Sequence, residues 1–201
     1  MKHGLKIMDK VNMSKKKHAF VLRFFKNDDK RIILFDKDKG KIICDSPQKN
    51  IPIGACIEYD LIVKRQKYIL YNTSIVLMPV IINQDDLLFL HQVLELCHYF
   101  MPEEMPEKDV FLLLLYLYDN MNLFSEPFSK KIYITKLLLM FGIYPEKPYI
   151  EKTYWQDMLQ QPISLLLRIK SSKEVEEFFI VWIRSCIQMH PLGHTFKAIK
   201  L

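Results

Sequence analysis

The sequence is poor in glycine, and its few glycines cannot form the common phosphate-binding loops. The five glycines, at positions 4, 40, 54, 142 and 193, fit neither the GxGxxG nor the GxxxxGK[ST] pattern, which removes the usual loops of dinucleotide- and nucleotide-dependent enzymes. The GxSxG turn that carries the serine of α/β-hydrolases is also missing from the sequence. We therefore predict a protein that is not an enzyme and has no catalytic residues.

Paired cysteines and long apolar runs are missing as well. Cys44, Cys56, Cys97 and Cys186 stand far apart without CxxC spacing, and the Lys-rich first 17 residues lack the apolar core of a signal peptide. The most apolar run, residues 110–118, is too short to cross a bilayer. Glu95 and His98 have the ExxH spacing of di-iron bundles, but a second ExxH is missing. We expect a soluble cytoplasmic protein without a metal, a cofactor or a membrane partner.

The positive charge of the chain is concentrated at one end. Residues 1–80 carry 17 Lys and Arg against 8 Asp and Glu, whereas residues 81–201 carry 12 against 15, so the net charges are +9 and −3. A local basic field raises the concentration of a polyanion around the protein. Nucleic acid or an anionic membrane surface is therefore the first class of partner to test.

The first part of the chain has the pattern of a small β-barrel. Runs rich in Ile, Val, Phe and Tyr, separated by turn residues, predict five strands near residues 18–25, 31–38, 41–46, 55–65 and 68–78. A sheet of this size must curl to bury one face, which leaves the OB-fold and the SH3-like barrel as candidates. We favour the OB-fold because the first three strands form a meander and the last two are long.

From Asn83 onward the apolar spacing becomes helical. Asn83 is a good N-cap, and Asp85 and Asp86 follow where the helix dipole favours acidic residues. Helices are predicted near 84–101, 106–121, 129–142, 162–170 and 172–190, whereas the proline-punctuated segment 144–161 is predicted without one. The predicted fold class is α+β: a five-stranded OB-fold barrel in residues 1–80, followed by an all-α domain in residues 81–201.

The candidate site is a set of basic and aromatic residues in the predicted barrel. Cations can follow the phosphates of a single strand while aromatic rings stack on its bases. The alternative is a lysine-rich solubilising surface with the aromatic residues in the core. The predicted DNA-binding residues are Lys15, Lys16, Lys17, Arg23, Lys26, Lys30, Arg31, Lys37, Lys39, Lys41, Lys64, Arg65 and Lys67, beside Phe24, Phe35, Tyr59 and Tyr68.

Several strings, in order along the chain, are similar to those of a known family. The strings are IILFDKDKGKI at 32–42, a helical start at 88–100 followed by MPEE at 101–104, VFLLLL at 110–115, KLLLMFGIYP at 136–145 and HPLG at 190–193. Together with the order of a basic barrel and a helical domain, they resemble the RecO family of bacterial DNA repair and recombination mediators. The four-cysteine zinc site of many members would follow the Gly-x-x-Pro segment, but residues 144–161 contain no cysteine, so we expect no zinc.

The resemblance implies a non-enzymatic function in the bacterial cytoplasm, close to the nucleoid. A protein of this kind binds single- and double-stranded DNA, anneals complementary strands and, with RecR, helps to load RecA onto strands covered by single-strand-binding protein. Lys130, Lys131 and Lys136 are candidate contacts for the acidic C-terminal tail of the single-strand-binding protein. The rival interpretation is a protein-interaction scaffold in which the barrel binds a protein or membrane partner and its lysines only solubilise it.

Overall fold

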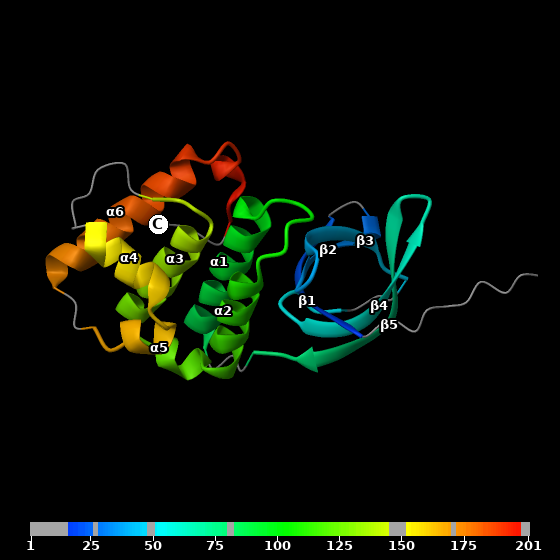
Figure 1. Ribbon diagram of the computed structural model, residues 1–201, viewed down its shortest axis with the longest axis horizontal. Helices are drawn as coiled ribbons and strands as arrows, with labels where there is room; N and C mark the ends of the chain where they lie inside the picture. The colour runs from blue at the N-terminus through cyan, green and yellow to red at the C-terminus, as the bar shows by residue number, and fades with distance from the viewer. Residues whose placement is uncertain are drawn as a thin grey trace, which may run out of the picture.

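The computed structural model describes residues 16–25, 28–47, 51–79, 83–144, 152–169 and 172–197. A small barrel is followed by a bundle of helices, with α1 and α2 between the barrel and the other helices (Figure 1). The elements are β1 (Lys17–Phe25), β2 (Asp28–Asp36), β3 (Gly40–Asp45), β4 (Cys56–Lys64), β5 (Lys67–Leu77), α1 (Gln84–Phe100), α2 (Lys108–Asp119), the 3-10 helix η1 (Met121–Phe124), α3 (Pro127–Met140), α4 (Lys152–Gln160), α5 (Ile163–Leu166), α6 (Lys173–Met189) and the 3-10 helix η2 (Gly193–Thr195).

The five strands close into a barrel in the order β1-β2-β3-β5-β4, and β1 pairs with β4 to complete it. All neighbouring pairs are antiparallel except β3 and β5, which are parallel at Cys44–Tyr68 and Asp45–Ile69. This topology confirms the prediction of an OB-fold followed by helices. Alternate side chains of β3 are buried, as expected for a strand with one face toward a barrel interior.

A buried carboxylate shapes the turn between β2 and β3. Asp36 is fully buried, and its Oδ1 accepts hydrogen bonds from the backbone N–H groups of Asp38 at 2.9 Å and Lys39 at 2.6 Å. Its Oδ2 accepts a third from the hydroxyl of Tyr59 at 2.5 Å. A buried carboxylate is tolerated only when such partners compensate for lost hydration. Tyr59 is therefore a core residue and not a platform for bases.

The helix starts follow local sequence signals. The structure also contains one helix that the sequence pattern does not predict. The side chain of Asn83 accepts from the backbone N–H of Asp86 at 2.9 Å, which confirms the predicted N-cap of α1. Ser172 caps α6 in the same way at 3.4 Å from the N–H of Val175. The prediction of no helix in residues 144–161 is wrong, because α4 occupies Lys152–Gln160.

The barrel and the helices share a hydrophobic core. One cluster of buried residues combines barrel side chains with most of the helical core, and a second lies within the barrel. At the boundary, the centre of the Phe111 ring of α2 lies 5.0 Å from the centre of the Phe20 ring and 5.5 Å from that of the Phe35 ring. The Tyr118 hydroxyl donates a hydrogen bond to the Gly54 carbonyl. Phe35, one of the aromatic residues predicted beside the basic set, is therefore buried at this junction.

Candidate nucleic-acid interface

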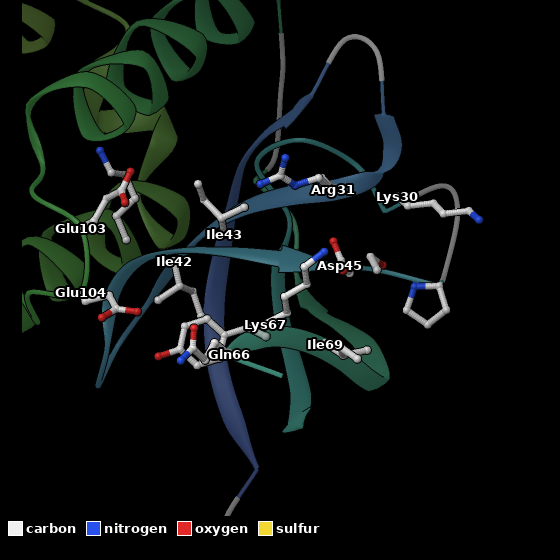
Figure 2. A pocket seen from close by; sticks show the side chains of 14 residues that line it. Lys30, Arg31, Ile42, Ile43, Asp45, Gln66, Lys67, Ile69, Glu103 and Glu104 are labelled. Carbon is white, nitrogen blue, oxygen red and sulfur yellow. The ribbon is translucent and has the colours of Figure 1, made fainter. Parts of the chain in front are cut away.

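A groove of about 820 Å³ lies along β3, between the start of β2 and the start of β5, next to the turn between β4 and β5 (Figure 2). The faces of strands 2 and 3, with the loops beside them, are where OB-folds bind oligonucleotides and oligosaccharides. The residues that line the groove are Lys30, Arg31, Lys41, Ile42, Ile43, Asp45, Ser46, Pro47, Gln66, Lys67, Tyr68, Ile69, Glu103 and Glu104.

Four predicted cations and one predicted aromatic residue meet in this groove. Lys30 and Arg31 are exposed at the start of β2, and Lys67 is exposed at the start of β5. These residues are distant in sequence and become neighbours because β3 pairs with both β2 and β5. In Figure 2 the side chain of Lys67 extends toward Asp45, below Arg31. The barrel topology thus gathers positive charge from two separate strands.

The aromatic residue in the groove is Tyr68, which is half-buried on β5. The ammonium of Lys39 lies 5.1 Å from the centre of its ring, a cation–π contact. The contact places a cation over the ring, which also packs against the buried core of the barrel. A base stacked on the exposed part of the ring would therefore lie close to a charge that can bind its phosphate.

The turn between β4 and β5 projects further cations beside the groove. Lys64 pairs with Lys67, so Arg65 and Gln66 form a two-residue turn, and both have positive φ, at 50° and 63°. Positive φ at both central residues is the signature of a type I′ hairpin turn, which matches the twist of the strands. Lys64 and Arg65 are exposed on this turn.

Two cations of the predicted set hold the barrel against α1. The Lys41 ammonium donates to the His98 carbonyl at 3.0 Å, and burial lowers the Lys41 pKa while Glu103 opposes that shift. The Arg23 guanidinium donates to the Tyr99 hydroxyl at 3.0 Å and contacts His98 Nε2 at 3.5 Å. The structure therefore gives Arg23 a role at this junction, and Lys41 lines the groove with its ammonium already bonded.

Three further predicted cations lie away from the groove lining. Lys16 forms an ion pair with Glu58, while Lys17 is half-buried at the start of β1 and Lys37 is exposed on the turn after β2. Lys15 and Lys26 lie outside the described residues. Phe24 belongs to β1, where it pairs with Ile32, and its side chain also lies outside the described part.

The groove also contains acidic residues that the sequence reasoning missed. Asp45 ends β3, and Glu103 and Glu104 belong to the connection between α1 and α2. The two glutamates reach the groove because the connection runs beside the start of β3. The backbones of Glu103 and Lys41 form an isolated parallel β-bridge, and the Glu104 N–H donates to the Lys41 carbonyl at 3.0 Å. The sequence offered only one hint, Gly40, whose missing side chain permits this close approach.

The three lysines predicted to contact an acidic tail have partners within the helical bundle. Lys130 forms an ion pair with Asp86 at 3.5 Å, and Lys131 pairs with Glu176 at 3.3 Å. Lys136 is buried, and its ammonium donates to the carbonyls of Met158, Leu159 and Gln161 at 2.9, 2.9 and 3.0 Å. A buried ammonium cannot meet a partner in solvent, so the structure argues against Lys136 as a binding residue.

His98 lies between cations at the junction of barrel and α1. Burial, with Arg23 and Lys41 nearby, lowers its pKa to about 4, so the ring is neutral at pH 7. Arginine can only donate, so Nε2 accepts from Arg23 and the proton belongs on Nδ1. That Nδ1 is buried and has no hydrogen-bond partner among the described residues.

The cysteines have the environment of structural residues. All four thiols are buried and unpaired. Burial raises the pKa of Cys44 to about 12 and those of Cys56 and Cys186 to about 11, and it also raises that of Cys97. Thiols with raised pKa are poor nucleophiles at neutral pH, because the thiolate is the reactive form.

Among the described residues, His, Cys, Asp and Glu do not gather in a group of three or more that could hold a metal ion. In the same part of the chain, no helix combines the length and apolarity needed to cross a membrane. Comparison of the chain with models of known protein families and with curated proteins found no match. The fold and the groove therefore carry the functional argument.

Proposed function

We propose that this protein binds single-stranded DNA in the groove of its OB-fold and acts, without catalysis, as a recombination mediator of the RecO kind. The observation that carries the proposal is the meeting of Lys30 and Arg31, from β2, with Lys67 and Tyr68, from β5, in one groove beside β3. OB-folds that bind single strands combine cations along the backbone with aromatic rings under the bases.

Each group of residues has a defined task in this proposal. Lys30, Arg31 and Lys67 bind phosphates inside the groove, and Lys64 and Arg65 extend the cationic path along the β4–β5 turn. Tyr68 supplies a stacking surface, which is worth about 1–3 kcal/mol for a base. Cations that contact only phosphates do not select a sequence, as a protein that covers any exposed strand requires.

The other activities proposed for this protein rest on the resemblance of its sequence to the RecO family. They are binding of double-stranded DNA, annealing of complementary strands and, with RecR, loading of RecA onto strands covered by single-strand-binding protein. Because Lys130, Lys131 and Lys136 have partners within the bundle, the acidic tail of the single-strand-binding protein is proposed as a partner without an assigned surface. The helical bundle, which is net negative in sequence, is the part proposed for protein contacts.

The test is a titration with fluorescent single-stranded DNA at several salt concentrations. Four to six phosphate contacts predict that log K falls with log salt with a slope of about −3 to −4. The K30E/R31E/K67E variant should abolish this binding. Its matched control is R168E/K173E/R184E, which changes the total charge equally at exposed residues of the helical bundle and should bind with nearly unchanged affinity.

Folding of both variants is checked by circular dichroism and thermal unfolding. Absence of binding by the wild-type protein at low salt, or a slope near zero, would refute the proposal. Equal loss of binding in the two folded variants would show that total charge, and not the groove, captures the DNA.

The scaffold interpretation remains a second candidate because apolar side chains are exposed on the barrel. Ile75, Val76 and Met78, at the end of β5 and just beyond it, are 49%, 47% and 44% exposed. Contiguous exposed apolar surface is typical of protein-binding sites, and such side chains are the raw material for one here. The scaffold interpretation would be supported if the wild-type protein does not bind DNA at low salt and if Val76→Asp weakens binding to a protein partner.

A further inference from the structure

The aromatic residue that lines the groove is covered by a cation. Tyr68 packs against the buried core of the barrel, and the Lys39 ammonium lies over its ring, 5.1 Å from the ring centre. Lys39 is half-buried and does not itself line the groove. A base can therefore stack on the covered face of this ring only after the ammonium has left it.

The backbone that carries Lys39 is held in place from the barrel interior. The Lys39 N–H donates to Oδ1 of the fully buried Asp36 at 2.6 Å, and the Tyr59 hydroxyl donates to Oδ2 of the same carboxylate at 2.5 Å. The lysine stem beyond this fixed backbone is a flexible four-carbon chain. The ammonium can therefore leave the ring through rotation of the side chain, while the turn keeps its shape.

The strengths of the two possible contacts of the ring favour such an exchange. A cation–π contact at a partly exposed site is weak, and a base stacked on an aromatic side chain is held more strongly. Within the described part of the chain, the Lys39 ammonium forms no ion pair. Its release therefore breaks the ring contact alone, and a strand in the groove offers phosphates to the released ammonium.

We propose that Lys39 controls access to the stacking surface of Tyr68. A base takes the place of the ammonium on the ring, and the ammonium moves to a phosphate of the same strand. This inference rests on the proposed binding of single-stranded DNA in the groove. One cation then has two contacts in turn: the aromatic ring in the free protein and a phosphate in the complex.

The test compares wild-type protein with Lys39→Met in titrations of a fluorescent oligothymidylate of about ten nucleotides, within the site size of one OB-fold. Methionine keeps most of the apolar stem and removes the charge. Loss of one phosphate contact should make the slope of log K against log salt shallower by about 0.7, so the variant should bind less tightly than wild type at low salt. At high salt the phosphate contact contributes little, and the variant should bind about threefold more tightly because its ring is uncovered. The two lines should therefore cross.

Two further variants show whether the crossing comes from the ring. Lys37→Met is the matched control, because Lys37 is exposed on the same turn and does not line the groove. It removes the same charge and should follow the wild-type line. In a Tyr68→Ala background, Lys39→Met should still make the slope shallower but should bring no gain at high salt.

The outcomes separate this inference from the proposed function. No binding of the oligothymidylate by wild-type protein at low salt refutes both. If the Lys39→Met line approaches the wild-type line at high salt without crossing it, or if the slope is unchanged, the control of access by Lys39 is refuted and the DNA-binding groove stands. Circular dichroism checks the folding of each variant, and Lys39→Gln, which also removes the charge, repeats the comparison if Lys39→Met does not fold.

Discussion

Replacing Lys136 by methionine tests the role that the structure assigns to this residue. Lys136 is 7% exposed, and its ammonium donates to the last carbonyls of α4, at Met158 and Leu159, and to Gln161 just beyond. The final carbonyls of a helix have no partner within the helix. Methionine keeps most of the apolar stem and removes only the donor, so the variant isolates these three bonds.

The magnitude follows from two opposing contributions. Hydrogen bonds from a charged donor are worth about 1.5–3 kcal/mol each. Burial opposes them, and it lowers the Lys136 pKa, because removing an ammonium from water costs several kcal/mol. We therefore expect Lys136→Met to lower the free energy of unfolding by about 2–4 kcal/mol, which corresponds to a fall in Tm of roughly 5–15 °C for a chain of this size.

The assay is urea unfolding followed by tryptophan fluorescence and circular dichroism. Lys131→Met is the control: its ion pair with Glu176 is partly exposed, so it should cost less than about 1 kcal/mol. A Lys136→Met variant as stable as wild type would refute the capping role. A variant of unchanged stability that binds an acidic peptide less tightly would instead restore the interpretation of Lys136 as a partner contact.

Three further predictions follow from the junction and the core. Gly40→Ala should destabilise the protein by more than about 2 kcal/mol in urea unfolding, because φ is 78° and the new Cβ would collide with the Met105 carbonyl; an unchanged midpoint would contradict this geometry. The His98 pKa, about 4 in the folded state, lies below the unfolded value of 6.5, so His98 should lower the free energy of unfolding as the pH falls from about 6.5 toward 4. His98→Gln should flatten the plot of unfolding free energy against pH in this range, and a plot identical to that of the wild type would refute the assignment. The four buried thiols should react with a thiol reagent such as DTNB only after unfolding, whereas fast labelling of the native protein would show that one of them is accessible.

The barrel and most of the helices could be predicted from the sequence because the patterns that indicate them are local. Strand patterns separated by turns and the Asn83 cap each lie within a few residues, and the structure confirms the barrel, the helices after it and that cap. Helix α4 was missed because prolines border its segment and its stability depends on distant residues. Lys136, 22 residues before Met158, supplies donors for its end, and such a partner leaves no local pattern.

The candidate site was only partly predictable for the same reason. The predicted strands contain Arg31 and Lys41, whereas Lys30 and Lys67 lie just outside them and belong to β2 and β5 in the structure. The sequence interpretation also treated all basic residues alike. Whether Arg23 or Lys41 faces solvent depends on Tyr99 and His98, which lie 76 and 57 residues away. The glutamates of the groove were missed because nothing near them in the chain relates them to β3.

The junction also changes the meaning of the uneven charge. A net +9 in residues 1–80 and −3 in residues 81–201 suggest two parts with separate tasks. In the structure, Phe20 and Phe35 of the barrel pack on Phe111 of α2, and the helical part supplies two residues of the groove. An isolated barrel would expose those aromatic rings and lose Glu103 and Glu104 from the lining of the groove. The proposed DNA binding must therefore be measured on the full chain, because residues of both parts line the groove.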